Sequence, residues 1–113
     1  MPYNKTLPSF IELAPFARAR EAYGMDDAEL LELQAALLAE PEAGDVIPGS
    51  GGCRKVRWRT PGHGKRGGYR VIYFLRTAAG SIVLVLLYAK NVRDNVDPEL
   101  LRKLKARFEQ CPN

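Results

Sequence analysis

The residues best suited to chemistry lie in one basic stretch, Cys53 to Arg70, with the sequence CRKVRWRTPGHGKRGGYR. It holds seven Lys or Arg residues and no Asp or Glu. Residues 46–93 hold ten basic and no acidic residues, whereas residues 1–45 hold nine acidic and three basic ones, so the net charge of +4 hides a strong asymmetry. A positive field without counter-charges attracts polyphosphates. The stretch predicts an anion site, with a solvated basic face as the alternative.

The first part of this stretch has the two-residue period of a strand. Successive side chains of a strand point to opposite faces, so Lys55, Arg57 and Arg59 share one face while Val56 and Trp58 share the other. Three cations are therefore expected to project together from a rigid ribbon.

The segment Thr60 to Gly68 predicts a glycine-rich turn between two strands. Its glycines satisfy G-x-G-x-x-G, but a strand follows them in place of the helix that a dinucleotide site needs. We expect Lys65 and Arg66 to contact a phosphate backbone from this turn. His63 fits either a phosphate contact or a general base.

The sequence gives little support for other kinds of catalytic or metal site. There is no Ser/His/Asp or Cys/His set, and Cys53, Cys111 and a single histidine make no metal cluster, so neither a metal nor a cofactor is expected. No apolar run has the length of a membrane span or a signal peptide, which predicts a cytoplasmic protein without a membrane partner.

Chemistry based on Lys, Arg and Tyr suits RNA cleavage, because RNA carries its own nucleophile, the 2′-hydroxyl. Clustered cations can stabilise the charge that develops on the phosphate. Tyr69, Tyr73 and Tyr88 could stack on bases, or they could be core residues.

The length of 113 residues indicates one domain, 1–113, of the α+β class. We expect a strand at Ser9–Leu13, a helix from Pro15 to Gly24, a helix from Asp26 to Pro41, a loop at Pro41–Gly52, strands from Cys53, at Tyr69–Leu75 and at Ser81–Ala89, and a helix from Asp97. The last three strands should form an antiparallel sheet, with the two N-terminal helices and the C-terminal helix on one face and the cations on the other.

Two segments carry a family resemblance: GDVIPGSGGCRKVRWRTPGHGKRGGYRVIY, and LLYAKN further along. In order and spacing they resemble the RelE/HigB superfamily of toxins from bacterial type II toxin–antitoxin modules, closest to the HigB branch. The resemblance covers nearly the whole chain and implies a small RelE-like domain.

The resemblance also implies an activity and partners. Such a toxin is a ribosome-dependent mRNA endoribonuclease (mRNA interferase) that inhibits translation. Its partners are the ribosome, mRNA and a cognate antitoxin, which is expected to be of the helix-turn-helix type and to mediate any binding to operator DNA.

By position, the resemblance implies catalytic roles for Lys55, Arg57, Arg70, Lys90 and Arg93, with Arg70 stabilising the scissile phosphate. RNA-binding roles are expected for Arg59, Lys65, Arg66, Tyr73 and Asn91. The best-studied RelE members have an arginine where this chain has Asn91 and a tyrosine near the position of Asp97, so the general acid and base stay unassigned.

Two alternatives follow. One is a catalytically weak RNA- or ribosome-binding protein on the same fold, which the residues at 91 and 97 favour. The other is a DNA-binding regulator, against which stands the lack of a basic recognition helix near the N-terminus.

Overall fold

The computed structural model describes residues 9–59, 68–76, 80–89 and 96–110. The elements are β1 (Ser9–Glu12), α1 (Ala14–Tyr23), α2 (Asp27–Ala39), β2 (Asp45–Val46), β3 (Arg54–Trp58), β4 (Tyr69–Arg76), β5 (Ser81–Ala89) and α3 (Pro98–Gln110). This is the predicted α+β class, and the order of elements agrees with the prediction except at β2. That short strand lies in the segment predicted to be only a loop.

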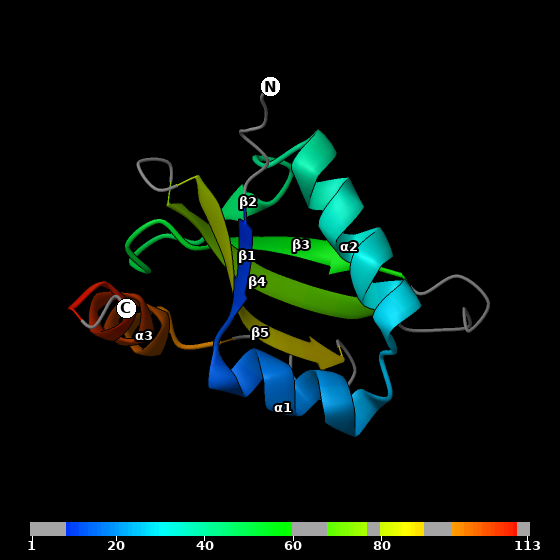
Figure 1. The fold of residues 1–113 in the computed structure, drawn as a ribbon. Helices are drawn as coiled ribbons and strands as arrows, with labels where there is room; N and C mark the ends of the chain where they lie inside the picture. The colour runs from blue at the N-terminus through cyan, green and yellow to red at the C-terminus, as the bar shows by residue number, and fades with distance from the viewer. Residues whose placement is uncertain (1–8, 60–67, 77–79, 90–95, 111–113) are drawn as a thin grey trace.

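The strands form one sheet in the order β1-β5-β4-β3-β2 (Figure 1). Strands β3, β4 and β5 are antiparallel neighbours, as predicted, and β2 extends the sheet antiparallel to β3. Strand β1 adds a parallel pair with β5 that was not predicted, with Ser9 opposite Ser81. A parallel pair needs a long connection, and in the described part of the chain two helices and three strands separate β1 from β5.

Strand β5 is an interior strand of the sheet, between β1 and β4. Leu84 and Leu87 pack into the core on one face, and Val83 and Val85 pack into the core on the other. A strand enclosed between β1 and β4 must be apolar on both faces, and β5 meets that requirement.

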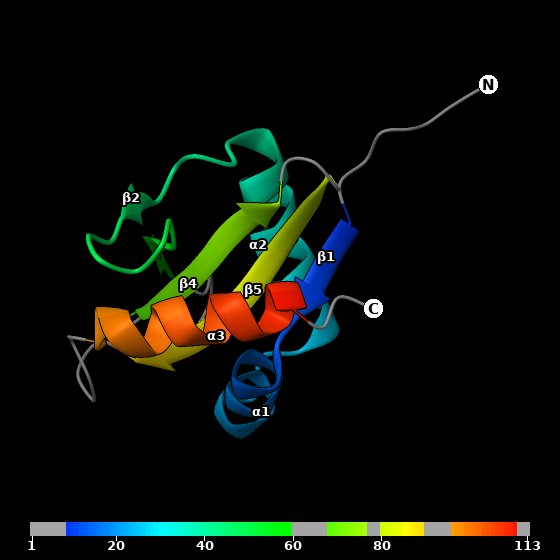
Figure 2. The ribbon, with the colours of Figure 1, turned by 90° about the vertical axis from the view of Figure 1, so that its left-hand side faces the viewer.

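The helices cover both faces of the sheet, so the prediction that they share one face is wrong. Phe16 of α1 and Leu33 of α2 pack on one face, whereas Leu101 of α3 packs on the other beside Phe74. Figure 2 shows α3 in front of β4 and β5, with α2 behind them. Because β4 and β5 are apolar on both sides, each face needs a helical cover.

Two helical leucines are exposed although each follows or precedes a buried leucine. Leu38 is 37% exposed and Leu100 is 45% exposed, because each is turned by about 100° from a buried neighbour, Leu37 or Leu101. None of the described helices combines the length and the apolar composition needed to cross a membrane.

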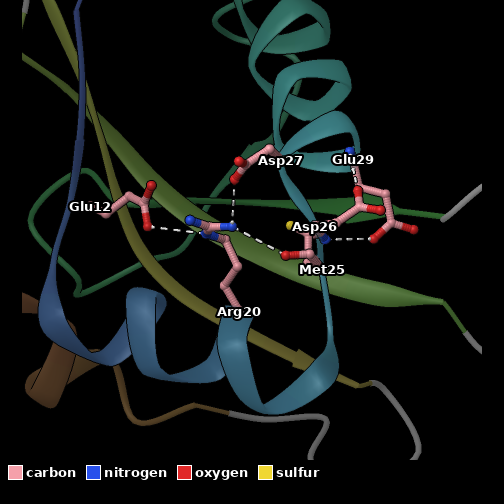
Figure 3. Close-up of polar contacts among 6 residues, drawn as sticks. All are labelled: Glu12, Arg20, Met25, Asp26, Asp27 and Glu29. Carbon is pink, nitrogen blue, oxygen red and sulfur yellow. Dashed lines mark hydrogen bonds and ion pairs between the residues drawn. The ribbon is translucent and has the colours of Figure 1, made fainter.

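Arg20 joins β1, α1 and the start of α2 (Figure 3). Its Nε donates to Glu12 Oε1 at 3.4 Å, its Nη1 donates to the carbonyl of Met25 at 3.1 Å, and its guanidinium lies 3.6 Å from Asp27 Oδ1. The arginine thereby fixes the corner between the two N-terminal helices.

A capping box formed by Asp26 and Glu29 begins α2. Asp26 Oδ1 accepts a hydrogen bond from the Glu29 backbone at 2.9 Å, and Glu29 Oε1 accepts one from the Asp26 backbone at 3.2 Å. Two backbone donors that the helix leaves unpaired are thereby satisfied.

Candidate functional site

The register of β3 and β4 places three predicted catalytic residues on one surface. Arg57 lies directly opposite Arg70, and Lys55 lies opposite Ile72. Residues opposite one another in an antiparallel pair point to the same face, as do residues two apart on a strand. Lys55, Arg57 and Arg70 therefore share the sheet face on which Ile72 packs with Leu101 of α3.

These cations surround a hollow at the β2 side of the sheet. Its volume is about 400 Å³, and it is lined by Ala43, Asp45, Lys55, Val56, Arg57 and Arg70. We call it the basic hollow. Its size falls in the range of about 300–1,000 Å³ that is usual for ligand sites.

Among the described residues, the arginines of the basic hollow have no carboxylate that neutralises them. Like charges directly opposite in a sheet are destabilising, and Arg57 and Arg70 occupy such positions. Within the described residues no carboxylate forms an ion pair with either arginine, and Arg70 Nε is buried without a hydrogen-bond partner. A bound anion would relieve the repulsion between the two guanidinium groups.

Asp45 brings a carboxylate into the basic hollow, which the sequence reasoning missed. It lies on β2, directly opposite Lys55 of β3. The signal was present in the segment GDVI, but a two-residue strand inside a loop rich in Pro and Gly has no detectable periodicity.

Tyr73 and Arg54 hold segment 41–45, which contributes Ala43 and Asp45 to the lining of the hollow. The Tyr73 hydroxyl accepts a hydrogen bond from the Gly44 backbone at 2.9 Å and donates one to the carbonyl of Pro41 at 2.8 Å. Arg54 Nη1 donates to the carbonyls of Gly44 at 2.8 Å and Glu42 at 3.3 Å. These hydrogen bonds attach segment 41–45 to β3 and β4.

The structure contradicts the prediction that Tyr73 stacks on a base. Its side chain is fully buried, and burial raises the pKa of its phenol, so the hydroxyl stays protonated in the network just described. Tyr69 and Tyr73 do lie on the face opposite Arg70, as expected. Tyr69 packs edge to face on Tyr23, with ring centroids 5.1 Å apart.

The remaining predicted site residues lie elsewhere. Arg59 follows the end of β3, is exposed and does not line the hollow. Residues Lys65, Arg66, Lys90, Asn91 and Arg93, together with His63, lie outside the described residues. Their expected roles stay predictions.

Comparison with known proteins reveals the family. A profile described as the RelE toxin of the RelE/RelB toxin–antitoxin system matches residues 12–111. The structure is also similar to that of an Escherichia coli RelE double mutant in the free state, with a TM-score of 0.53 and 13% identity over 79% of this chain and 90% of that one.

A second similar structure is an archaeal RelE–RelB complex from Pyrococcus horikoshii. It has a TM-score of 0.45 and 16% identity, and the match covers 78% of this chain and all of that one. At 13% identity the E. coli structure indicates the fold alone, whereas the profile match extends over most of the sequence. The chain belongs to the RelE toxin family.

Proposed function

We propose that this protein is a ribosome-dependent mRNA endoribonuclease of the HigB branch, the toxin of a type II module. The observation that carries this proposal is the pair of opposed arginines, Arg57 and Arg70, in a hollow that also contains Lys55. No carboxylate of the described residues forms an ion pair with either arginine. The GDVI, KRGGYR and YAKN elements support the HigB branch.

In this mechanism the hollow holds the scissile phosphate of a messenger RNA. The 2′-oxygen attacks the phosphorus, the bond from phosphorus to the 5′-oxygen breaks, and the products carry a 2′,3′-cyclic phosphate and a 5′-hydroxyl. The Arg70 guanidinium stabilises the charge that develops on the phosphoryl oxygens. Lys55 and Arg57 hold the flanking phosphate backbone in place.

The wider assignments remain part of this proposal. The protein acts as one domain in the cytoplasm, where a cognate antitoxin of the helix-turn-helix type neutralises it. Lys90 and Arg93 complete the catalytic group, and the RNA-binding surface includes Arg59, Lys65, Arg66 and Asn91.

A second candidate is an RNA- or ribosome-binding protein with weak catalysis. Asp97 stands near the position of a tyrosine in the best-studied relatives, and here Asp97 Oδ1 accepts a hydrogen bond from the Glu99 backbone at 3.0 Å at the start of α3. Asp97 is therefore occupied as a helix cap, and no base-stacking group is assigned at that position.

Controlled expression without an antitoxin tests the proposal. The wild-type chain should arrest growth and leave cuts in translated mRNAs, mapped by their new 5′ ends. Arg70→Ala should relieve both effects at equal protein level, whereas the control Arg107→Ala on α3 should not. Normal growth with intact transcripts on wild-type expression would favour the second candidate.

A further inference from the structure

We propose that the Asp45 carboxylate is the proton acceptor of the cleavage reaction. This inference rests on the proposed function and adds the general base that the family resemblance left unassigned. It starts from an acidic side chain that lines an otherwise basic site.

The position of Asp45 is set by the sheet. It lies directly opposite Lys55 across the antiparallel pair β2–β3, and residues so placed have Cβ atoms about 5 Å apart on one face. Lys55 and Arg57 are in turn on the same face of β3. A phosphate held by the cations would therefore lie close to the carboxylate.

The backbone before Asp45 is fixed more firmly than an exposed loop requires. Gly44 is buried, its N–H and its carbonyl are bonded to Tyr73 and Arg54, and an added Cβ would come within 3.0 Å of the Lys55 carbonyl oxygen and 3.1 Å of Tyr73 Cε1. A side chain at this position would force the Lys55 backbone or the Tyr73 ring to shift by a few tenths of an ångström, so the close packing favours glycine. It also holds the residue that follows, Asp45, at a constant position beside the hollow, as a catalytic group requires.

The carboxylate also remains available for chemistry. Although Asp45 faces Lys55, no ion pair within 4.0 Å joins them in the part of the chain that the structure describes. A carboxylate not committed to a cation can accept a proton within hydrogen-bond reach.

The proposed step balances as follows. An Asp45 oxygen takes the proton of the 2′-hydroxyl while the 2′-oxygen bonds to phosphorus. The 5′-oxygen then leaves with the electron pair of its broken bond and takes a proton from solvent, and Asp45 returns its proton to solvent. No oxidant, metal or other reactant is needed.

A counter-charge role for Asp45 predicts different behaviour. If it only offset the repulsion among the cations, removing its charge would strengthen RNA binding and leave the cleavage rate nearly unchanged. If it is the proton acceptor, removing its charge lowers the rate while binding is kept or strengthened.

The test is single-turnover cleavage of an mRNA on programmed ribosomes, at a site first mapped with the wild-type protein. Asp45→Asn should lower the cleavage rate by roughly 10²- to 10⁴-fold. Its affinity for the same mRNA with a 2′-deoxy nucleotide at that site should be equal or higher. The control Glu32→Gln removes one negative charge from the exposed side of α2 and should leave the rate unchanged.

A substrate with sulfur in place of the leaving 5′-oxygen separates base from acid, because a thiolate leaves without protonation. Asp45→Asn should stay defective on this substrate; recovery of the rate would mean that Asp45 acts as an acid and would overturn the proposal. A wild-type rate for Asp45→Asn on the normal substrate would also overturn it. Failure of the wild-type protein to cleave at all would instead refute the proposed function.

Discussion

The molecule has two basic regions, the hollow on β3 and β4 and the outer side of α3, and they differ in how their charges are compensated. On α3, Arg102 pairs with Glu99 at 2.7 Å and Lys105 with Glu109 at 3.0 Å, at the spacings of neighbouring helical turns. In the basic hollow, Arg57 and Arg70 face each other with no ion-pairing carboxylate among the described residues.

The difference shows that charge density alone does not identify a binding surface. Both regions read as basic in the sequence, but on α3 the exposed Arg102 and the half-buried Lys105 each pair with a glutamate of the same helix. In the hollow two like charges, Arg57 and Arg70, lie opposite each other, and a bound anion would relieve their repulsion. Sites that break a local stability rule in this way are candidates for function.

The largest difference between the two regions should be in their contribution to RNA affinity. Exchanging Arg57 and Arg70 for glutamate should weaken binding to single-stranded RNA by more than about tenfold and make its salt dependence shallower by about 0.7 per lost phosphate contact. The same exchange at Arg102 and Arg107 of α3 should change little. Titrations across a salt series measure this, and equal losses in both double variants would remove the distinction.

The hydroxyl of Tyr73 should matter for stability. Tyr73→Phe removes both hydrogen bonds to segment 41–45 and should lower the free energy of unfolding by about 1–3 kcal/mol, as measured in urea. Cleavage should fall as well if the segment positions Asp45. An unchanged free energy of unfolding would mean that these two hydrogen bonds do not hold segment 41–45 in place.

The free energy of unfolding at alkaline pH should also depend on Tyr73. Burial raises the pKa of Tyr73 above its usual 10.0, so the folded state keeps the phenol proton where the unfolded chain has lost it. The resulting stability is fully present below the unfolded pKa and is lost as pH rises toward the folded pKa. Wild-type stability should therefore decline more steeply than that of Tyr73→Phe above about pH 10, and parallel curves would contradict this.

Single neutral substitutions should shift stability in opposite directions in the two regions. Arg57→Leu removes the repulsion opposite Arg70 and should raise the free energy of unfolding by about 0.2–1 kcal/mol. Arg102→Ala removes a helical ion pair and should lower it by about 0.2–0.5 kcal/mol. Urea unfolding at low salt measures both, and a loss of stability in Arg57→Leu would mean that the arginine is neutralised in the free protein.

Periodicity predicted most of the fold. The alternation in β3, the apolar run of β5 and the capping box of α2 each depend on local spacing, and local spacing is visible in a sequence. The parallel pairing of β1 and the placement of α3 on the opposite face depend on how distant segments meet. The apolar faces of β4 and β5 require cover on both sides of the sheet, but the local pattern of each helix does not say which face that helix covers.

The site could be predicted only in part. Lys55 and Arg57 were placed together by strand alternation, and the family resemblance added Arg70. Asp45 was missed because only the pairing of β2 with β3 brings it to the hollow. Tyr73 was misjudged because a strand tyrosine suits a core or a surface equally well, and its two partners, Pro41 and Gly44, lie far away in the sequence.

The most direct test of the central claim is the rate at which purified Arg70→Ala cleaves ribosome-bound mRNA in a single turnover, beside the wild-type protein and Arg107→Ala. The account predicts that Arg70→Ala cleaves about 10²- to 10³-fold more slowly while keeping its fold, and that Arg107→Ala matches the wild type. A wild-type rate for a folded Arg70→Ala protein would contradict the account.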